Sequence, residues 1–455
     1  MSTQSTLQLY RGILKAAKQF PSMKKVSLIR EIKLRFHQDM HETDEKKVAH
    51  CLVLAQRGLS DLEAYLPKGD GKLVNGRVTS GPSLEVHVNG MTLPNPFVIG
   101  SGPPGTNYQV MKKAFDEGWG GVICKTMSLD SSKVVNVTPR YGKLRDSGNK
   151  VFGWENFELI SDRPFETMLA ELKRLKQEYP DRVLIASIME EYNKNSWEEI
   201  IGRCEEVGVD AFELNFSCPH GMPERRMGMA MGQDVELLSE VSGWINAAAT
   251  KPVWAKMTPN ITDISEPALA SLVTGCEGVA AINTIQCVIG VNLDTLRPEP
   301  SVEGYSTPGG YSYQAVKPIA LAKVMSIATM IARDFPGEGK SLSGIGGIET
   351  GEDAAEFILL GSDTVQVCTG VMVHGYSHVK TLAGGLQRFM QKHNFTSLAQ
   401  CKGLALPYFT THTDLVARQR AAISAKRLKQ VGLANDADWS GEDFVANAES
   451  MVANR

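Results

Sequence analysis

The chain has 455 residues, of which 42% are hydrophobic and 22% charged, so it can bury a large core and keep an ordinary soluble surface. No stretch reaches the roughly 18 uninterrupted apolar residues that a membrane-spanning helix needs, and the start lacks the apolar core of a secretory signal. The net charge of -3 gives no reason to expect a nucleic-acid partner, so we expect a soluble protein that is not secreted.

Residues 1–66 carry apolar residues at spacings of three and four, which predicts three short amphipathic helices with breaks near Pro21 and Thr43. Such helices bury their apolar stripes against one another, so we expect a three-helix bundle. This segment holds 11 Lys and Arg against 7 Asp and Glu, so a partner chosen by charge should be acidic. Residues 67–83 are rich in Pro, Gly, Ser and Lys, which is typical of a linker.

Residues 84–400 alternate short apolar runs, bounded by Gly or Pro, with longer segments of helical pattern. The strand candidates are Phe97–Gly102, Gly121–Thr126, Val183–Met189, Ala211–Ser217, Pro252–Thr258, Gly278–Thr284, Ser341–Gly347 and Thr364–Gly370. This α/β pattern predicts a closed (β/α)8 TIM barrel, which suits the number of strands and a span of about 300 residues. A doubly wound open sheet is the alternative, because periodicity does not show closure. One more helix is expected at 414–431, within a tail of residues 401–455.

The segment Gly100-Ser-Gly-Pro-Pro-Gly105 follows the first strand and fits the G-x-G-x-x-G pattern of dinucleotide-binding folds. Pro103 and Pro104, however, lack the backbone N–H groups that a pyrophosphate needs. The next strand also ends in Lys125-Thr126 instead of an acidic residue. We interpret the segment as a loop that lets the backbone approach a flat ligand.

The 8 cysteines are spread through the chain, and no two are spaced as C-x-x-C. Zinc and iron–sulfur sites use closely spaced ligands, so we predict no metal site and expect free thiols in a reducing compartment.

The segment Glu213-Leu-Asn-Phe-Ser-Cys-Pro-His-Gly-Met222 resembles the dihydropyrimidine dehydrogenase branch of the dihydroorotate dehydrogenase-like family. The same resemblance is carried, in order along the chain, by Lys125-Thr-Met-Ser-Leu-Asp130, Ala255-Lys-Met-Thr-Pro-Asn260 and Asn283-Thr284. It extends from about Asn95 to Lys392. The family's members are flavin enzymes built on a (β/α)8 barrel, so the resemblance implies that fold and a bound FMN.

The resemblance also assigns residues to the flavin. Reduced flavin carries negative charge near N1 and O2, which a fixed cation stabilises, and Lys256 takes that position with Lys125 nearby. The phosphate is expected on backbone groups after the seventh and eighth strands. The residues expected to bind FMN are Ser101, Gly102, Lys125, Thr126, Lys256, Gly310, Gly346, Gly347, Cys368 and Thr369.

Cys218 is the expected catalytic residue, because the family uses a cysteine at this position as general acid or base. The implied substrate is a pyrimidine base, whose imide edge alternates donors and acceptors that side-chain amides match. The residues expected to bind it are Asn156, Glu158, Asn215, Phe216, Ser217, Asn283 and Thr284. Where the family usually has Gly-Glu-Arg-Gly, this chain has Pro223-Glu-Arg-Arg226, so we expect a stiffer and more basic lid.

The expected reaction is therefore FMN-dependent reduction of uracil and thymine to 5,6-dihydropyrimidines, a step of pyrimidine catabolism, with a proton from Cys218. Oxidation of dihydroorotate is the rival activity. A non-catalytic assembly adaptor is the rival from another class of protein. Because the sequence shows neither a nucleotide-binding motif nor a cluster motif, we expect a separate reductase to supply electrons. A homodimer is also expected.

Leu9-Tyr-Arg11, with Phe36 downstream after basic residues, resembles the LYR-motif proteins. The resemblance implies that residues 1–66 bind an acyl carrier protein and that the protein lies in the mitochondrial matrix. A cytoplasmic protein, whose helical bundle only docks on the barrel, is the alternative.

Overall fold

The computed structural model describes residues 6, 9–14, 17, 25–39, 44–64, 73–130, 134–218 and 227–424. The chain divides into two units, Met1–Leu406 and Pro407–Arg455. The first unit contains the barrel and the N-terminal helices, and the second contains the helix α14.

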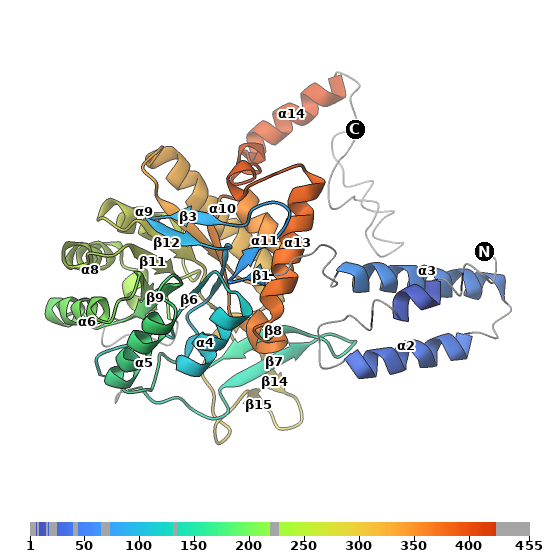
Figure 1. Cartoon of the computed structure of the whole chain (residues 1–455), viewed down its shortest axis with the longest axis horizontal. Helices are drawn as coiled ribbons and strands as arrows, with labels where there is room; N and C mark the ends of the chain where they lie inside the picture. The colour runs from blue at the N-terminus through green and yellow to red at the C-terminus, as the bar shows by residue number, and fades with distance from the viewer. Residues whose placement is uncertain are drawn as a thin grey trace. The chain divides into compact units, whose positions relative to one another are not determined.

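Parallel strands form a closed barrel at the centre of the first unit (Figure 1). In barrel order they are β5 (Phe97–Ile99), β6 (Gly121–Ile123), β9 (Val183–Ile188), β10 (Ala211–Phe216), β11 (Val253–Met257), β12 (Gly278–Ala281), β17 (Ser341–Ile345) and β18 (Thr364–Val367). The last strand pairs with the first, with Val367 opposite Ile99. This pairing confirms the predicted (β/α)8 barrel and shows that the doubly wound open sheet was wrong.

Helices surround the barrel because each one buries a single apolar face against it. They are α4 (Tyr108–Glu117), α5 (Phe165–Glu178), α6 (Lys194–Glu206), α7 (Met229–Gly232), α8 (Val235–Ala248), α9 (Ser265–Val273), α10 (Lys317–Asp334), α11 (Gly351–Leu359), α12 (Thr369–His374) and α13 (His378–Lys392). In α4, Met111 and Phe115 are buried, and the Asn107 side chain caps the first turn by accepting from the Val110 backbone N–H. Each such fully buried side chain contributes about 1.5–3 kcal/mol.

In the part of the chain that the structure describes, the segment Gln314–Asp334 is long and apolar enough to cross a membrane by length and composition. In this fold it contains α10, an outer helix of the barrel. Val324 and Ile327 of α10 are fully buried, and Ala328 is buried beside them in the barrel core. The apolar residues of this helix are therefore used at least in part for packing on the barrel.

The amino end of the barrel is covered by a hairpin of β3 (Val86–Val88) and β4 (Met91–Leu93). Asn89, at the tip of this hairpin, donates to the backbone carbonyls of Glu277 and Gly339, and accepts from the Trp254 indole at 2.8 Å. These residues lie at or beside the first residues of barrel strands, so the hairpin closes this end. A shorter hairpin of β1 (Leu73–Val74) and β2 (Arg77–Val78) precedes it.

An antiparallel sheet stands beside the carboxyl ends of the strands. Its order is β13 (Ile285–Cys287), β16 (Gly309–Ser312), β8 (Val151–Asn156) and β7 (Tyr141–Arg145). Two of its strands come from the segment after β6 and two from the segment after β12, and Asn156 pairs with Gly310 between them. The second segment also forms the hairpin of β14 (Gly290–Asn292) and β15 (Arg297–Glu299). We refer to the antiparallel sheet as the roof sheet; the sequence did not predict it.

Near the N-terminus, residues 9–14 are helical, and α2 (Lys25–Asp39) and α3 (Glu45–Ala64) follow. Ile13 and Ala17 are buried, and the Tyr10 ring lies 4.3 Å from the Phe36 ring between centroids. The second unit contains α14 (His412–Ser424), which begins two residues before the helix predicted at 414–431, and residues 425–431 of that prediction lie outside the described residues.

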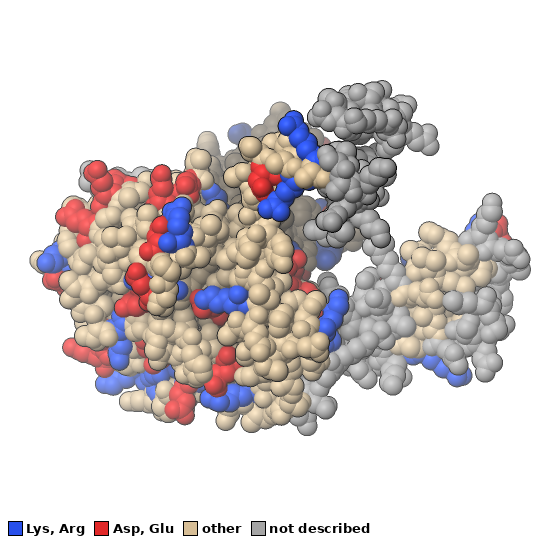
Figure 2. Space-filling view, turned by 90° about the horizontal axis from the view of Figure 1, so that it is seen from above, with Lys and Arg blue, Asp and Glu red and all other residues tan. Residues whose placement is uncertain are grey.

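Figure 2 shows acidic and basic side chains interspersed over one face of the barrel. A nucleic acid needs a continuous basic surface, and this face does not provide one.

Candidate active site

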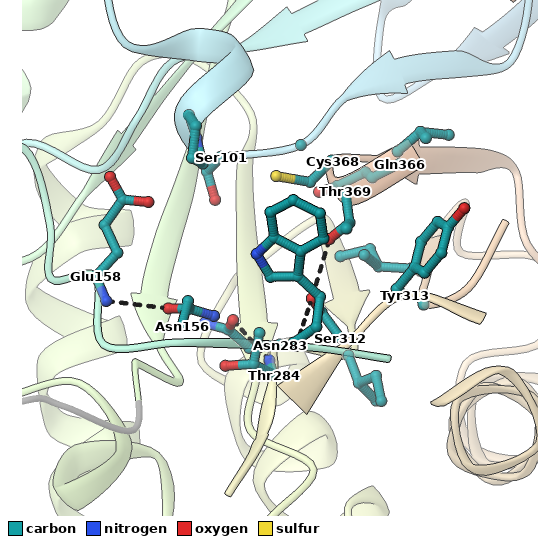
Figure 3. Close-up of a pocket in the computed structure, with 18 of the residues that line it drawn as sticks. Ser101, Asn156, Glu158, Asn283, Thr284, Ser312, Tyr313, Gln366, Cys368 and Thr369 are labelled. Atoms are coloured by element: carbon teal, nitrogen blue, oxygen red, sulfur yellow. Dashed lines mark hydrogen bonds between the residues drawn. The ribbon is translucent and has the colours of Figure 1, made fainter. Parts of the chain in front are cut away.

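A cavity opens at the carboxyl ends of the barrel strands, with a volume of about 1140 Å³ that includes space open to solvent. Barrel enzymes carry their chemistry at this end, because the loops after all the strands meet there. The predicted residues that line the cavity are Ser101, Gly102, Lys125, Thr126, Asn156, Glu158, Asn215, Cys218, Lys256, Asn283, Thr284, Gly346, Gly347, Cys368 and Thr369. Figure 3 shows Asn156, Asn283 and Thr284 gathered on one side, away from Cys368 and Thr369.

Three predicted residues do not line the cavity. Phe216 is buried in the core, where its ring meets Trp197 edge-on at 6.3 Å between centroids. Successive side chains of a strand point to opposite faces, so the position after Asn215 turns away from the barrel interior. The Ser217 side chain is buried between two amides, and Gly310 lies in the roof sheet, where its carbonyl accepts from Asn156.

Lys256 projects from β11 and is held by a buried carboxylate. Its Nζ donates to Glu213 Oε1 at 3.2 Å and to Ser101 Oγ at 3.0 Å. Glu213 also accepts from Ser101 Oγ at 2.9 Å and from Gln366 Nε2 at 2.7 Å. The cation is therefore fixed in position, and its charge is balanced within the barrel.

Lys125, at the end of β6, is paired in the same way with Glu158. Glu158 also accepts from the Tyr141 hydroxyl at 2.6 Å and lies 3.4 Å from an Arg140 nitrogen. Burial and the hydrogen bond to Glu158 raise the pKa of Tyr141, so this hydroxyl stays protonated and remains a donor at neutral pH.

Cys218 follows β10 and is 7% exposed. The Asn215 side chain holds its backbone, because Oδ1 accepts from the Cys218 N–H at 3.0 Å and from the Ser217 N–H at 3.2 Å. Asn215 Nδ2 donates to Thr126 Oγ1 at 3.0 Å. One amide therefore joins the ends of two strands and fixes the start of the loop that carries the thiol. The lid residues Pro223 and Arg226 lie outside the described residues.

The side-chain amides at the rim of the cavity are also held by hydrogen bonds. Asn283 Nδ2 donates to Ser217 Oγ at 2.8 Å, and Asn156 Nδ2 donates to the Gly310 carbonyl at 2.9 Å. Gly310 has no room for a side chain, since a Cβ there would lie 2.3 Å from Thr284 Oγ1. The rim is therefore tightly packed and presents amide and hydroxyl groups to the cavity.

The loop after β17 has a backbone that only glycine adopts freely. Gly346 and Gly347 have φ angles of 132° and 79°, and a Cβ on Gly347 would lie 2.8 Å from the Lys317 Cβ. On the neighbouring loop, Thr369 Oγ1 lies 3.0 Å from Ser312 Oγ of the roof sheet. Burial raises the pKa of Cys368 to about 12, so its thiol stays protonated beside the cavity.

Sequence reasoning missed several lining residues, among them Tyr141, Trp154, Tyr311 and Gln366. Trp154 Nε1 and Gln366 Oε1 are buried without a hydrogen-bond partner among the described residues. An unpaired buried donor or acceptor costs about 1–3 kcal/mol, which a ligand in the cavity offsets when it completes the bond. These two atoms, the paired lysines and the glycine loop fit a flat polar ring that carries an anionic group. Among the described residues, no three metal-ligating side chains converge.

Residues 83–390 match the dihydroorotate dehydrogenase family, and residues 4–61 match the LYR family of complex 1 proteins. The chain is 66% identical over 401 residues to the chloroplastic dihydropyrimidine dehydrogenase (NADP(+)) of Arabidopsis thaliana, covering 87% of this chain and 94% of the relative. It is 44% identical over 323 residues to the NAD-dependent dihydropyrimidine dehydrogenase subunit PreA of Escherichia coli K12, covering 71% of this chain and 76% of the relative.

A solved structure with the same fold is the dihydroorotate dehydrogenase of Eimeria tenella in complex with ferulenol. Its TM-score is 0.59 at 20% sequence identity, and the match covers 81% of this chain and 98% of that one. The family match spans the barrel and its cavity. The chain therefore belongs to the dihydroorotate dehydrogenase family, with an LYR-family domain before the barrel.

Proposed function

We propose that the protein is an FMN-dependent oxidoreductase that reduces the 5,6 double bond of uracil or thymine. The observation that carries this proposal is the charge state of the cavity. Among the described lining residues the cations are Lys125 and Lys256, and each forms an ion pair with a carboxylate. A neutral pyrimidine base suits such a cavity, since amides can match its imide edge.

Dihydroorotate oxidation is the rival reaction, and its substrate carries a carboxylate. Such a group needs a cation that is free to pair with it. Lys125 and Lys256 already pair with Glu158 and Glu213, so neither lysine of the cavity lining is free for a second carboxylate. The 66% identity to a plant dihydropyrimidine dehydrogenase supports the same choice.

The proposed cofactor is FMN, held by Ser101, Gly102, Lys125, Thr126 and Lys256, with its phosphate on backbone groups of Gly346, Gly347, Cys368 and Thr369. Gly310, predicted as a further contact, is proposed to act through the Asn156 side chain that its carbonyl holds. Bound FMN supplies the hydride that the reduction of a carbon–carbon double bond requires. Lys256 places a cation at the cavity wall, and the Gly346-Gly347 loop also lines the cavity.

The proposed proton donor is the Cys218 thiol, and the other residues orient the ring. Asn215 fixes the Cys218 backbone, so the thiol would give up its proton from one defined position. Asn156, Asn283 and Thr284 lie together on one side of the cavity, where their polar groups can bind the ring's donors and acceptors. Glu158 is proposed as a further substrate contact, whereas Phe216 and Ser217 act through packing and positioning.

We propose that electrons come from a separate reductase. The Escherichia coli relative is described as a subunit of an NAD-dependent enzyme, which supports a division of labour between chains. The purified chain should then fail to oxidise NADPH in the presence of uracil, and dithionite or a suitable reductase should restore turnover. Brisk NADPH oxidation by the chain alone would contradict this. A homodimer is also proposed.

For the N-terminal domain we propose an acyl carrier protein as partner and an organelle as location. Its first 40 residues hold 8 Lys and Arg against 2 Asp and Glu, which suits an acidic partner. The LYR-family match supports the mitochondrial matrix, while the Arabidopsis relative is described as chloroplastic. Imaging of a tagged protein against markers of both organelles distinguishes the two, and a cytosolic signal contradicts both.

The function is tested by an absorbance spectrum of the purified protein, followed by anaerobic reduction with dithionite and addition of a pyrimidine. We expect a flavin spectrum that bleaches on reduction and returns when uracil or thymine is added. Return with orotate and not with uracil would reverse the choice of substrate. Protein that is colourless, and stays so after FMN is supplied, would support the non-catalytic adaptor.

A further inference from the structure

Glu213 is a buried carboxylate that does not line the cavity but contacts residues that do. Its side chain is 0% exposed. It accepts hydrogen bonds from Ser101, two residues after β5, from Lys256 on β11 and from Gln366 on β18. All three donors line the cavity. One layer of side chains therefore separates the negative charge of Glu213 from the cavity.

Stability alone does not account for a charge at this position. Removing a carboxylate from water costs several kcal/mol, and a buried ion pair is often no more stable than neutral residues of the same volume. The Gln366 amide could be satisfied equally well by a neutral acceptor. What a neutral side chain would not do is balance the charge of Lys256 while holding its Nζ against Ser101.

We propose that Glu213 is a positioning residue that sets the reduction potential of the bound flavin by balancing the charge of Lys256. This inference rests on the proposed function, because it requires FMN in the cavity. An unpaired lysine would favour the extra negative charge of reduced flavin and so raise the potential. The Lys256–Glu213 pair has no net charge, so it keeps the potential lower while the Nζ group still lies in the cavity wall.

A low potential fits the proposed substrate. A neutral base lacks the electron-withdrawing carboxylate of orotate, so its double bond accepts a hydride less readily and needs a stronger reductant. The cavity meets that need by pairing its lysines, and Glu213 is the partner that lies wholly inside the barrel. Glu158, the partner of Lys125, lies on the cavity wall and is 10% exposed in its side chain.

The test compares flavin reduction potentials in the full-length holoprotein, measured by equilibration with a reference dye, so that no substrate is involved. Glu213→Gln should favour reduced flavin at least tenfold, which is about 30 mV for a two-electron couple. Lys256→Gln should shift the potential in the opposite direction. The double variant Glu213→Gln/Lys256→Gln removes a neutral pair, so its ratio of reduced to oxidised flavin at a given potential should return to within a few-fold of the parent's.

The matched control is Glu277→Gln, which removes a carboxylate at the amino end of the barrel, where Glu277 accepts from the Val253 N–H at 2.8 Å. Its potential should equal the parent's. The double variant leaves no unpaired charge buried, so it remains informative if Glu213→Gln fails to fold. A double variant with the same low potential as Lys256→Gln overturns the inference, as does an unshifted Glu213→Gln. Failure of the parent to bind FMN overturns the proposed function as well.

Discussion

Asn283 Nδ2 donates a 2.8 Å hydrogen bond to Ser217 Oγ, which joins the segment after β12 to the residue that precedes Cys218. Ser217 Oγ in turn donates to Asn215 Oδ1 at 3.1 Å. A hydroxyl group therefore connects the two amides that flank the thiol, although it does not line the cavity itself. The position of the thiol depends on both loops.

The first prediction follows from this connection. Ser217→Ala removes the hydroxyl and should lower kcat for uracil by about tenfold, the value of one net hydrogen bond. FMN binding should not change, because Ser217 does not contact the cavity. Steady-state kinetics and a flavin titration measure the two effects. Unchanged kcat would show that the thiol is positioned without this hydroxyl.

Replacing Cys218 by alanine should leave the fold and the flavin in place and reduce turnover by about 10²–10⁴-fold, as loss of a general acid does. The side chain packs in a small cluster with Ile160, Met189 and Met227, so loss of one sulfur atom changes little else. Cys276→Ala is the control, because Cys276 precedes β12 at the other end of the barrel. Burial raises the pKa of its thiol to about 12, so this thiol stays protonated. Equal rates for both variants would remove Cys218 from the mechanism.

The unpaired Trp154 indole N–H should contribute to ligand binding. Trp154→Phe keeps an aromatic ring in the roof sheet but loses the donor, so FMN should bind about five- to tenfold more weakly, the value of one hydrogen bond. Trp197→Phe is the control, because its indole already donates to the Glu191 carbonyl at 2.9 Å. Titration of FMN into the apoproteins gives both affinities. Equal affinities would mean that the indole does not meet the cofactor.

Burial, and then the nearby His374 ring, lower the pKa of His378 from 6.5 to about 4. The unfolded chain therefore takes up a proton at a higher pH than the folded protein does. Stability should fall as the pH drops from about 6.5 towards 4, by up to about 3 kcal/mol. Glu349 and Asp353 also face this ring and partly oppose the shift.

Urea unfolding at several pH values tests this. In a plot of the free energy of unfolding against pH, His378→Gln should remove the fall between pH 6.5 and 4. His393→Gln, at an exposed position, should follow the parent. A parent curve that is already flat between pH 6.5 and 4 would mean that His378 is protonated in the folded state.

Arg11 and Arg35 are exposed on the N-terminal helices, near the packed rings of Tyr10 and Phe36. Arg11→Ala/Arg35→Ala should reduce recovery of acyl carrier protein from the native cell by at least tenfold, because these cations would meet its acidic helix. Flavin content should be unchanged. If neither the parent nor the variant recovers acyl carrier protein, the proposed partner is wrong.

The barrel could be predicted from sequence because its strands are short apolar runs that end at Gly or Pro, and the strand-end residues Lys125, Asn215 and Lys256 follow from that register. The roof sheet could not be predicted. Its strands are partly exposed, as in Tyr141–Arg145, and β8 pairs with β16 more than 150 positions away. Trp154 and Tyr311 were missed for that reason.

Other site residues were missed because a motif does not show where side chains point. Phe216 and Asn215 are adjacent in the sequence but face opposite sides of the strand, so assigning both to the substrate overlooked the alternation. Glu213 stands in the same motif, and only the structure shows that it pairs with Lys256.

The roof sheet is built from two loops that leave the barrel after β6 and after β12. No barrel strand takes part in its pairing, so mutations can accumulate in the roof sheet while the eight-stranded ladder stays intact. Glu213, which holds Lys256, and Asn215, which holds the start of the thiol's loop, are on the barrel, whereas Asn156 and Trp154 belong to the roof. A gene that exchanged only these two loops with a relative could therefore change which ring is accepted and retain the same redox chemistry.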